Sequence, residues 1–151
     1  MLRRSSMTGG SGLGEGRQGV TRFVVGLDAA LALAELDAAV PARHRLLAPT
    51  LLRSQVLAQL YGEVRSGRLT RQDAERRQGY LRRLPIRLLG DRVLQQTAWK
   101  IAEELGWRDT FVAEYLALTR LQADALVVRD SELAKIARSV VAVARFEDLL
   151  A

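Results

Sequence analysis

Two aspartates, Asp28 and Asp130, lie far apart in the chain but in the same local setting. Each follows a short apolar run, residues 23–27 and 125–128, and each precedes a helical pattern. Because the carboxyl ends of parallel strands meet at one edge of a sheet, both carboxylates are expected at the edge where open α/β folds bind ligands. Two carboxylates suit a hard divalent cation, which prefers oxygen ligands. The alternative is that each aspartate only caps the helix that follows it.

Asp109 and Gln55 are further candidates for the same edge. Asp109 opens a helical segment at residues 110–121, and it reaches the edge if this helix packs behind the central strands. Gln55 lies in the second turn of the helix that follows Pro49 and Thr50. Its amide oxygen would be a neutral cation ligand, or its amide nitrogen a hydrogen-bond donor. The alternative for Gln55 is an ordinary surface glutamine.

The residue types that are absent narrow the possible chemistry. The chain has no cysteine, which excludes disulfides, thiolate nucleophiles and iron–sulfur clusters. Its one histidine, His44, lies between two arginines in an expected loop, so neither a histidine-rich metal centre nor a serine–histidine–acid triad is supported. No glycine-rich phosphate loop follows an expected strand. Any metal here is therefore bound mainly through oxygen.

The elements that must position these residues alternate between short apolar runs and helical patterns. The expected strands are residues 23–27, 46–48, 86–89, 125–128 and 140–143. The expected helices are residues 29–36, 51–65, 71–84, 92–105, 110–121 and 131–137. This alternation predicts an α/β fold, a three-layer sandwich with a central, mostly parallel sheet and helices on both faces.

The 151 residues fit one domain of ordinary size. Residues 1–19 contain six glycines and no apolar periodicity, so we expect a flexible N-terminal tail there and a folded domain over residues 20–151. No apolar stretch is long enough for a signal peptide or a membrane span. A cytoplasmic protein without membrane attachment is therefore expected.

The net charge of +6 favours polyanionic partners, either nucleic acid or an acidic protein. Arginines are concentrated between residues 65 and 87, where they would neutralise phosphates along an RNA strand. Two alternatives remain. The arginine content is also typical of a GC-rich genome, and the same arginines are expected on an ordinary solvated face balanced in part by Glu63, Asp73 and Glu75.

Four stretches of the chain together resemble the PIN domain, the nuclease fold best known from the VapC toxins of bacterial toxin–antitoxin pairs. They are the opening strand with Asp28, residues 48–56 (APTLLRSQV), residues 106–118 (GWRDTFVAEYLAL) and residues 126–133 (LVVRDSEL). The resemblance implies a PIN-like domain over residues 20–151. It also implies Mg²⁺ or Mn²⁺ as cofactor, RNA as substrate, a cognate antitoxin protein as partner, and a homodimer.

Only part of the family's acidic pattern is present. Asp28 and Asp130 match two of the usual cation-binding positions, but Gln55 replaces a usual glutamate and Val112 a usual aspartate. Asp109 is expected to act as a third ligand, and Gln55 as a weakened ligand or a group that orients water. The resemblance thus implies a catalytic set of Asp28, Gln55, Asp109 and Asp130, with Asp28, Asp109 and Asp130 as the metal ligands.

The two substitutions are expected to lower activity. Each lost carboxylate weakens cation binding, and a loss of about 3 to 4 kcal/mol of transition-state stabilisation corresponds to a few hundredfold in rate. The prediction is a metal-dependent endoribonuclease of the VapC toxin type with attenuated activity. The alternative is a degenerate PIN module that binds an antitoxin or RNA without cleaving it.

Overall fold

A computed structural model describes residues 20–151, so the tail expected at residues 1–19 lies outside the described residues. Five strands form one sheet in the order β3-β2-β1-β4-β5, and every neighbouring pair is parallel. The strands are β1 Thr21–Val25, β2 His44–Pro49, β3 Ile86–Leu89, β4 Ala125–Val127 and β5 Val143–Ala144. The expected α/β fold with a parallel central sheet is confirmed.

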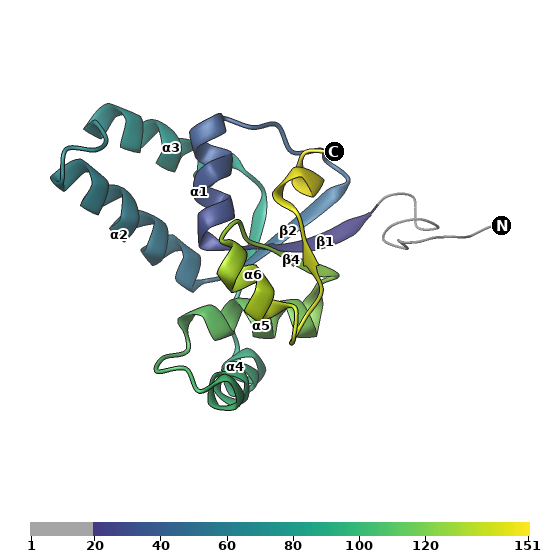
Figure 1. Cartoon of the computed structure of the whole chain (residues 1–151). Helices are drawn as coiled ribbons and strands as arrows, with labels where there is room; N and C mark the ends of the chain where they lie inside the picture. Colours follow the sequence, from purple (N-terminus) through teal and green to yellow (C-terminus); the bar gives the residue numbers. More distant parts are fainter. Residues whose placement is uncertain (1–19) are drawn as a thin grey trace.

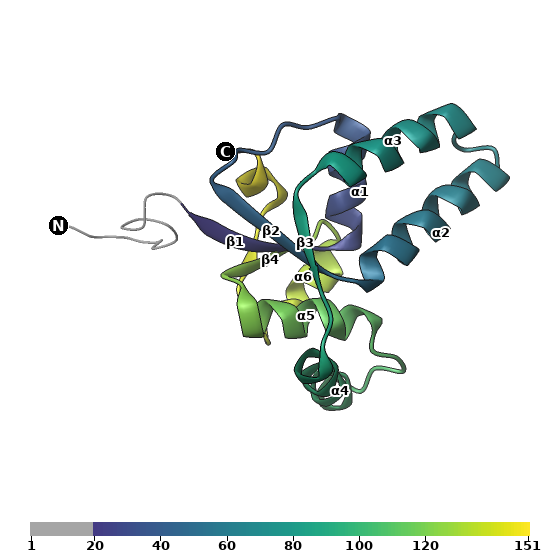
Figure 2. The same ribbon diagram turned by 180° about the vertical axis from the view of Figure 1, so that it is seen from behind.

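Helices cover both faces of this sheet. They are α1 Leu27–Leu36, α2 Leu51–Arg65, α3 Arg71–Arg83, α4 Arg92–Leu105, α5 Phe111–Gln122 and α6 Ser131–Ala137, and a short 3₁₀ helix at Phe146–Leu149 follows β5. α1, α2 and α3 contact one another on one side, while α4 packs on α5 and α5 on β1, β2 and β4 on the other (Figures 1 and 2). The result is the expected three-layer sandwich. No helix within residues 20–151 combines the length and the apolar character needed to cross a bilayer.

The central strands are apolar and buried toward their carboxyl ends, where both of their faces are covered. Val24, Val25, Leu126 and Val127 have no exposed surface. Strands that are buried on both faces consist of continuous runs of β-branched residues and leucine, instead of alternating apolar and polar residues. The two runs that suggested strands therefore form the middle of the core.

Local capping sets several of the helix ends. The Thr70 hydroxyl accepts from the amide of Asp73 at the start of α3, and the Asp91 carboxylate accepts from the amide of Leu94 at the start of α4. Gly106 ends α4 with a φ of 70°, a left-handed conformation that glycine adopts at low cost. All three boundaries agree with the sequence-based prediction.

Several element boundaries differ from the prediction: β2, for example, begins at His44, which was expected in a loop. Two of the differences have a clear local cause. β1 ends at Val25 and α1 already begins at Leu27, because the Gly26 carbonyl accepts from the amide of Ala30 and so starts the helix. The last strand begins at Val143 instead of residue 140. The amides of Val140 and Val141 both bond back to the carbonyl of Ala137, and this turn delays the return to the sheet.

The strand order places a crevice between β1 and β4. From β1 the chain builds outward through β2 to β3, whereas β4 leads outward to β5 on the other side. Ligands of open α/β folds bind beyond the carboxyl ends of the strands at such a switch point. α1 follows β1 and α6 follows β4, so the N-termini of these two helices meet at this crevice.

Candidate functional site

Asp28 lies in the first turn of α1, where its carboxylate joins two segments that are distant in the sequence. Its Oδ2 accepts hydrogen bonds from the backbone amides of Arg129 at 2.9 Å and Asp130 at 2.8 Å. Its Oδ1 is buried and has no hydrogen-bond partner in the described part of the chain. Because a buried carboxylate oxygen without a partner is costly, this atom is suited to receive a ligand. The side chain is thus fixed in place with one oxygen available.

Asp130 is the N-cap residue of α6. Its Oδ1 accepts from the amide of Glu132 at 3.0 Å, and the side chain is exposed. The capping interpretation is therefore correct for Asp130. The two interpretations are compatible, because capping uses one carboxylate oxygen and the residue still borders the crevice. Asp28, in contrast, does not cap α1, whose N-cap residue is Gly26.

The two aspartates share a cavity of about 320 Å³ among α1, α2, α5 and α6. Four of the positions singled out from the sequence line it together: Asp28, Gln55, Val112 and Asp130. The remaining lining residues are Gly26, Leu27, Leu31, Gln59, Tyr115, Leu126, Val128 and Leu133. A small acidic crevice with largely apolar walls is thus present at the switch point of the sheet.

Asp109, the expected third ligand, is not among the residues that the structure brings together at this cavity. Asp109 does not line the cavity; its Oδ1 accepts from the amide of Phe111 at 3.2 Å at the start of α5. Within residues 20–151 no three acidic, histidine or cysteine side chains gather in a group that could hold a metal ion. Glu114, in the first turn of α5, also lies outside the cavity lining, and burial raises its pKa.

Gln55 has an unexpected partner in Tyr115. The phenol Oη of Tyr115 donates to Gln55 Oε1 at 2.6 Å, joining α5 to α2 across the cavity. Burial, together with the charges of Glu114 and Asp28, raises the pKa of Tyr115, so the phenol stays protonated and remains a donor. The sequence held a usable signal for this residue: Tyr115 lies three positions after Val112, a spacing that places both on one face of a helix.

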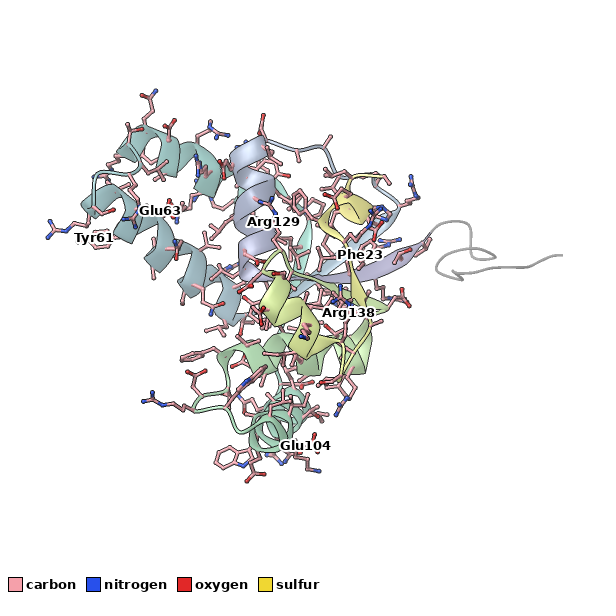
Figure 3. The ribbon with its side chains drawn as sticks, viewed as in Figure 1. Phe23, Tyr61, Glu63, Glu104, Arg129 and Arg138 are labelled. Carbon is pink, nitrogen blue, oxygen red and sulfur yellow. The ribbon has the colours of Figure 1, made fainter. Side chains whose placement is uncertain are left out.

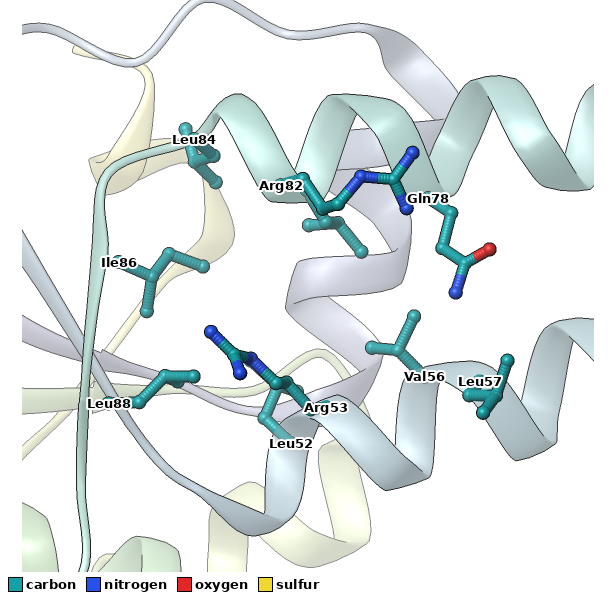
Figure 4. Close-up of a pocket in the computed structure, with 10 residues that line it drawn as sticks. Leu52, Arg53, Val56, Leu57, Gln78, Arg82, Leu84, Ile86 and Leu88 are labelled. Carbon is teal, nitrogen blue, oxygen red and sulfur yellow. The ribbon is translucent and has the colours of Figure 1, made fainter.

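A second, larger hollow lies between α2, α3 and the edge strand β3 (Figure 4). Its volume is about 610 Å³ and its walls are mostly apolar. The lining residues are Leu52, Arg53, Val56, Leu57, Gln78, Leu81, Arg82, Leu84, Ile86 and Leu88. We refer to it as the α2–α3 groove; none of its lining residues borders the acidic cavity.

The arginines are distributed unevenly around the acidic cavity. Arg129, labelled in Figure 3, directly precedes Asp130. Its guanidinium carbon lies 5.0 Å from the centre of the Phe146 ring. α3, which carries many of the arginines, packs at the other end of α1: Tyr80 donates to the carbonyl of Ala38, and Arg76 to that of Ala34. Since α1 rises about 1.5 Å per residue, these contacts lie roughly 10 to 15 Å along it from Asp28.

The fold and the site define a parallel α/β protein with an acidic crevice at the switch point of its sheet. No protein-family description matches the chain, and no curated protein is similar to it in sequence. Among solved structures it is similar to the crystal structure of PAE2754 from Pyrobaculum aerophilum, with a TM-score of 0.69 and 24% sequence identity. The similarity covers 87% of this chain and 93% of that chain. At this level of identity the likeness shows a shared fold.

Proposed function

We propose that the chain is a divalent-cation-dependent endoribonuclease of the PIN type, in which Asp28 and Asp130 hold the cation. The observation that carries the proposal is the buried Asp28 Oδ1, which has no hydrogen-bond partner within residues 20–151. The Asp28 side chain lines one cavity together with Asp130. The net charge of +6 supports a polyanionic substrate. The absence of cysteine is consistent with the cytoplasm as the place of action.

The donor atoms present are suited to Mg²⁺ or Mn²⁺. Mg²⁺ commonly binds one or two carboxylates and completes its shell with waters and phosphate oxygens of the substrate. Asp28 Oδ1 would gain the partner that the protein does not supply, and Asp130 would contribute the second carboxylate. When bound, the cation would neutralise phosphate charge and activate water.

The rest of the cavity wall explains why slow cleavage is part of the proposal. Val112 offers no ligand atom, and the Oε1 of Gln55 already accepts from Tyr115. Two carboxylates alone leave the cation less tightly held than a larger acidic set would. Asp28 contributes orientation as well as charge, because its two backbone hydrogen bonds leave the side chain little freedom to turn.

The direct test is cleavage of a fluorescent single-stranded RNA by the full chain. We expect cleavage with Mn²⁺ or Mg²⁺, none with EDTA, and a loss of about a hundredfold or more in Asp28→Asn, since several kcal/mol depend on the cation. The asparagine retains an oxygen for the two amides, so the variant keeps its fold. Equal cleavage by the variant purified in the same way would remove Asp28 from the reaction and contradict the proposal.

A second candidate function is favoured by the α2–α3 groove. In this alternative the chain binds without cleaving, as a degenerate module that receives an amphipathic segment of an antitoxin. The groove is apolar along its walls and carries Arg53 and Arg82, so its occupant would present apolar side chains with acidic residues beside them (Figure 4). Binding of an acidic amphipathic peptide that is lost in Leu57→Asp, at a groove residue that is 56% exposed, supports this function, and undiminished binding by Leu57→Asp argues against it.

The homodimer implied by the family resemblance belongs to the same proposal. α4 exposes Trp99, which is 65% accessible, and this side chain offers an apolar contact for a second copy. Light scattering on the full chain tests this: a dimer that becomes monomeric in Trp99→Glu supports it, and a wild-type monomer refutes it.

A further inference from the structure

Two glutamines of α2 line the acidic cavity, and the structure gives their amides opposite arrangements. Gln59 Nε2 donates to Glu63 Oε2 at 2.8 Å, one turn further along α2. In Gln55 the amide oxygen makes the hydrogen bond instead: Oε1 accepts from Tyr115 Oη at 2.6 Å. A primary amide has one oxygen acceptor and one nitrogen that donates two hydrogen bonds. For Gln55 it is the nitrogen that has no partner within residues 20–151.

Tyr115 is well suited to hold this arrangement. Tyr115 is only 5% exposed, and the helix that carries it, α5, packs on β1, β2 and β4. A buried ring has few alternative rotamers, so the position of its hydroxyl is set by the packing of α5 on the sheet. The phenol thereby fixes the rotation of the Gln55 amide from the opposite wall of the cavity.

We propose that Tyr115 is a positioning residue that holds the Gln55 amide oxygen and so presents the Gln55 amide nitrogen to a non-bridging phosphate oxygen of the RNA strand. The inference rests on the proposed function and changes the role of Gln55 within it. Gln55 becomes a substrate-binding residue, where the sequence suggested a weakened cation ligand.

The negative charges of Asp28 and Asp130 favour a neutral hydrogen-bond donor at position 55. Asp28 and Asp130 attract a cation but repel the phosphodiester that must approach it. A glutamate at position 55 would add to this repulsion, whereas an amide N–H₂ donates to a phosphate oxygen without changing the charge. A carbonyl oxygen that already accepts a short O–H bond is in turn a poorer ligand for the cation.

The experiment measures two affinities separately on the full chain. The first is for a fluorescein-labelled single-stranded RNA in saturating Ca²⁺, a hard cation that takes oxygen ligands and compensates the two carboxylates, with a gel to verify that the RNA stays intact. The second is for Mn²⁺ alone. We expect Gln55→Leu, Gln55→Glu and Tyr115→Phe each to weaken RNA binding about fivefold, the effect of one hydrogen bond. The double variant Gln55→Leu/Tyr115→Phe should be no weaker than Gln55→Leu. Mn²⁺ affinity should stay unchanged in Gln55→Leu and in Tyr115→Phe.

Gln59→Leu is the matched control, because Gln59 lines the same cavity on the same helix but directs its nitrogen to Glu63. Its RNA affinity should equal that of the wild type. RNA binding that is unaffected in Gln55→Leu and Gln55→Glu would overturn the inference, as would a loss of Mn²⁺ affinity in Gln55→Leu. RNA binding by Gln55→Leu and Gln55→Glu tests the inference even if Tyr115→Phe folds poorly. A wild-type chain that binds no RNA overturns the proposed function itself, so the two failures are distinguishable.

Discussion

The carboxylate of Asp28 serves two purposes with its two oxygens. Oδ2 fastens the first turn of α1 to the amides of Arg129 and Asp130, which hold the end of β4 beside the end of β1. Oδ1 is buried without a partner. An asparagine retains an acceptor for the amides but removes the negative charge, so Asp28→Asn separates the structural purpose from the cation-binding one.

Cation binding should therefore be visible as thermal stabilisation, independently of any cleavage. With a Kd of about 1 mM, Mn²⁺ at ten times that concentration adds about 1.4 kcal/mol, or roughly 3 to 6 °C in Tm for a domain of this size. We expect this shift in the wild type and its absence in Asp28→Asn. The control is Asp124→Asn, whose carboxylate accepts from the amide of Arg22 away from the cavity and which should keep the shift. A shift that persists in Asp28→Asn would contradict the assignment.

Restoring the two missing acids should strengthen the centre. Gln55→Glu/Val112→Asp adds two carboxylates to a cavity that already contains Asp28 and Asp130. We expect at least tenfold tighter Mn²⁺ binding and a rise in cleavage rate of about a hundredfold, which corresponds to 2.7 kcal/mol of barrier. Isothermal titration and RNA cleavage measure the two effects.

Its matched control is Gln55→Glu/Val112→Asn, which keeps the shape at position 112 without the charge and should give a smaller gain in Mn²⁺ affinity. Cleavage that appears only in Gln55→Glu/Val112→Asp, with none detectable in the natural chain, favours the degenerate-module interpretation. An unchanged Mn²⁺ affinity would show that the cavity does not hold a cation.

At the scale of elements, the sequence was informative where the signal is local. Apolar runs and caps predicted the sheet, the start of α4 at Asp91 and the end of α4 at Gly106. Asp109 could not be placed from the sequence, because its type and position show only that it precedes a helix. Whether it faces the cavity depends on how α5 docks on the sheet, which is set by packing among residues far apart in the chain. The Gln55–Tyr115 bond was missed for the same reason, since it joins two helices.

The junction between β1 and α1 depends on Gly26. A Cβ there would lie 2.6 Å from Val128 Cγ1 and 3.1 Å from the carbonyl oxygen of Val127. We expect Gly26→Ala to lower the free energy of unfolding by about 1 to 3 kcal/mol, the usual cost of overpacking. Gly62, in the exposed part of α2, has nothing within 4 Å of its Cβ position, so Gly62→Ala should raise stability by up to about 1 kcal/mol. Urea unfolding of both variants measures the difference, and equal effects would refute the argument.

At the scale of the whole molecule, the net charge of +6 coexists with an acidic cavity. Some arginines of α3 already have partners in the protein: Arg71 pairs with Glu75 at 3.2 Å, and Arg76 approaches Asp37 at 4.0 Å. These pairs lie on α3 and at the far end of α1, so they favour the solvated-face interpretation of this part of the chain. Arg129, beside Asp130, is better placed to meet a phosphate next to the cation.

Salt dependence distinguishes these two sets of arginines. Each phosphate neutralised on a single strand contributes about −0.7 to the slope of log K against log salt concentration. Arg129→Gln should therefore weaken RNA binding and make the slope shallower by about 0.7. Arg71→Gln removes the same formal charge from a side chain that is 84% exposed and paired with Glu75, so both the affinity and the slope should change little. Filter binding between roughly 50 and 200 mM salt covers the useful range. Equal effects of the two substitutions would mean that RNA responds to the total charge of the molecule, and the acidic cavity would lose its role as the place where the strand is bound.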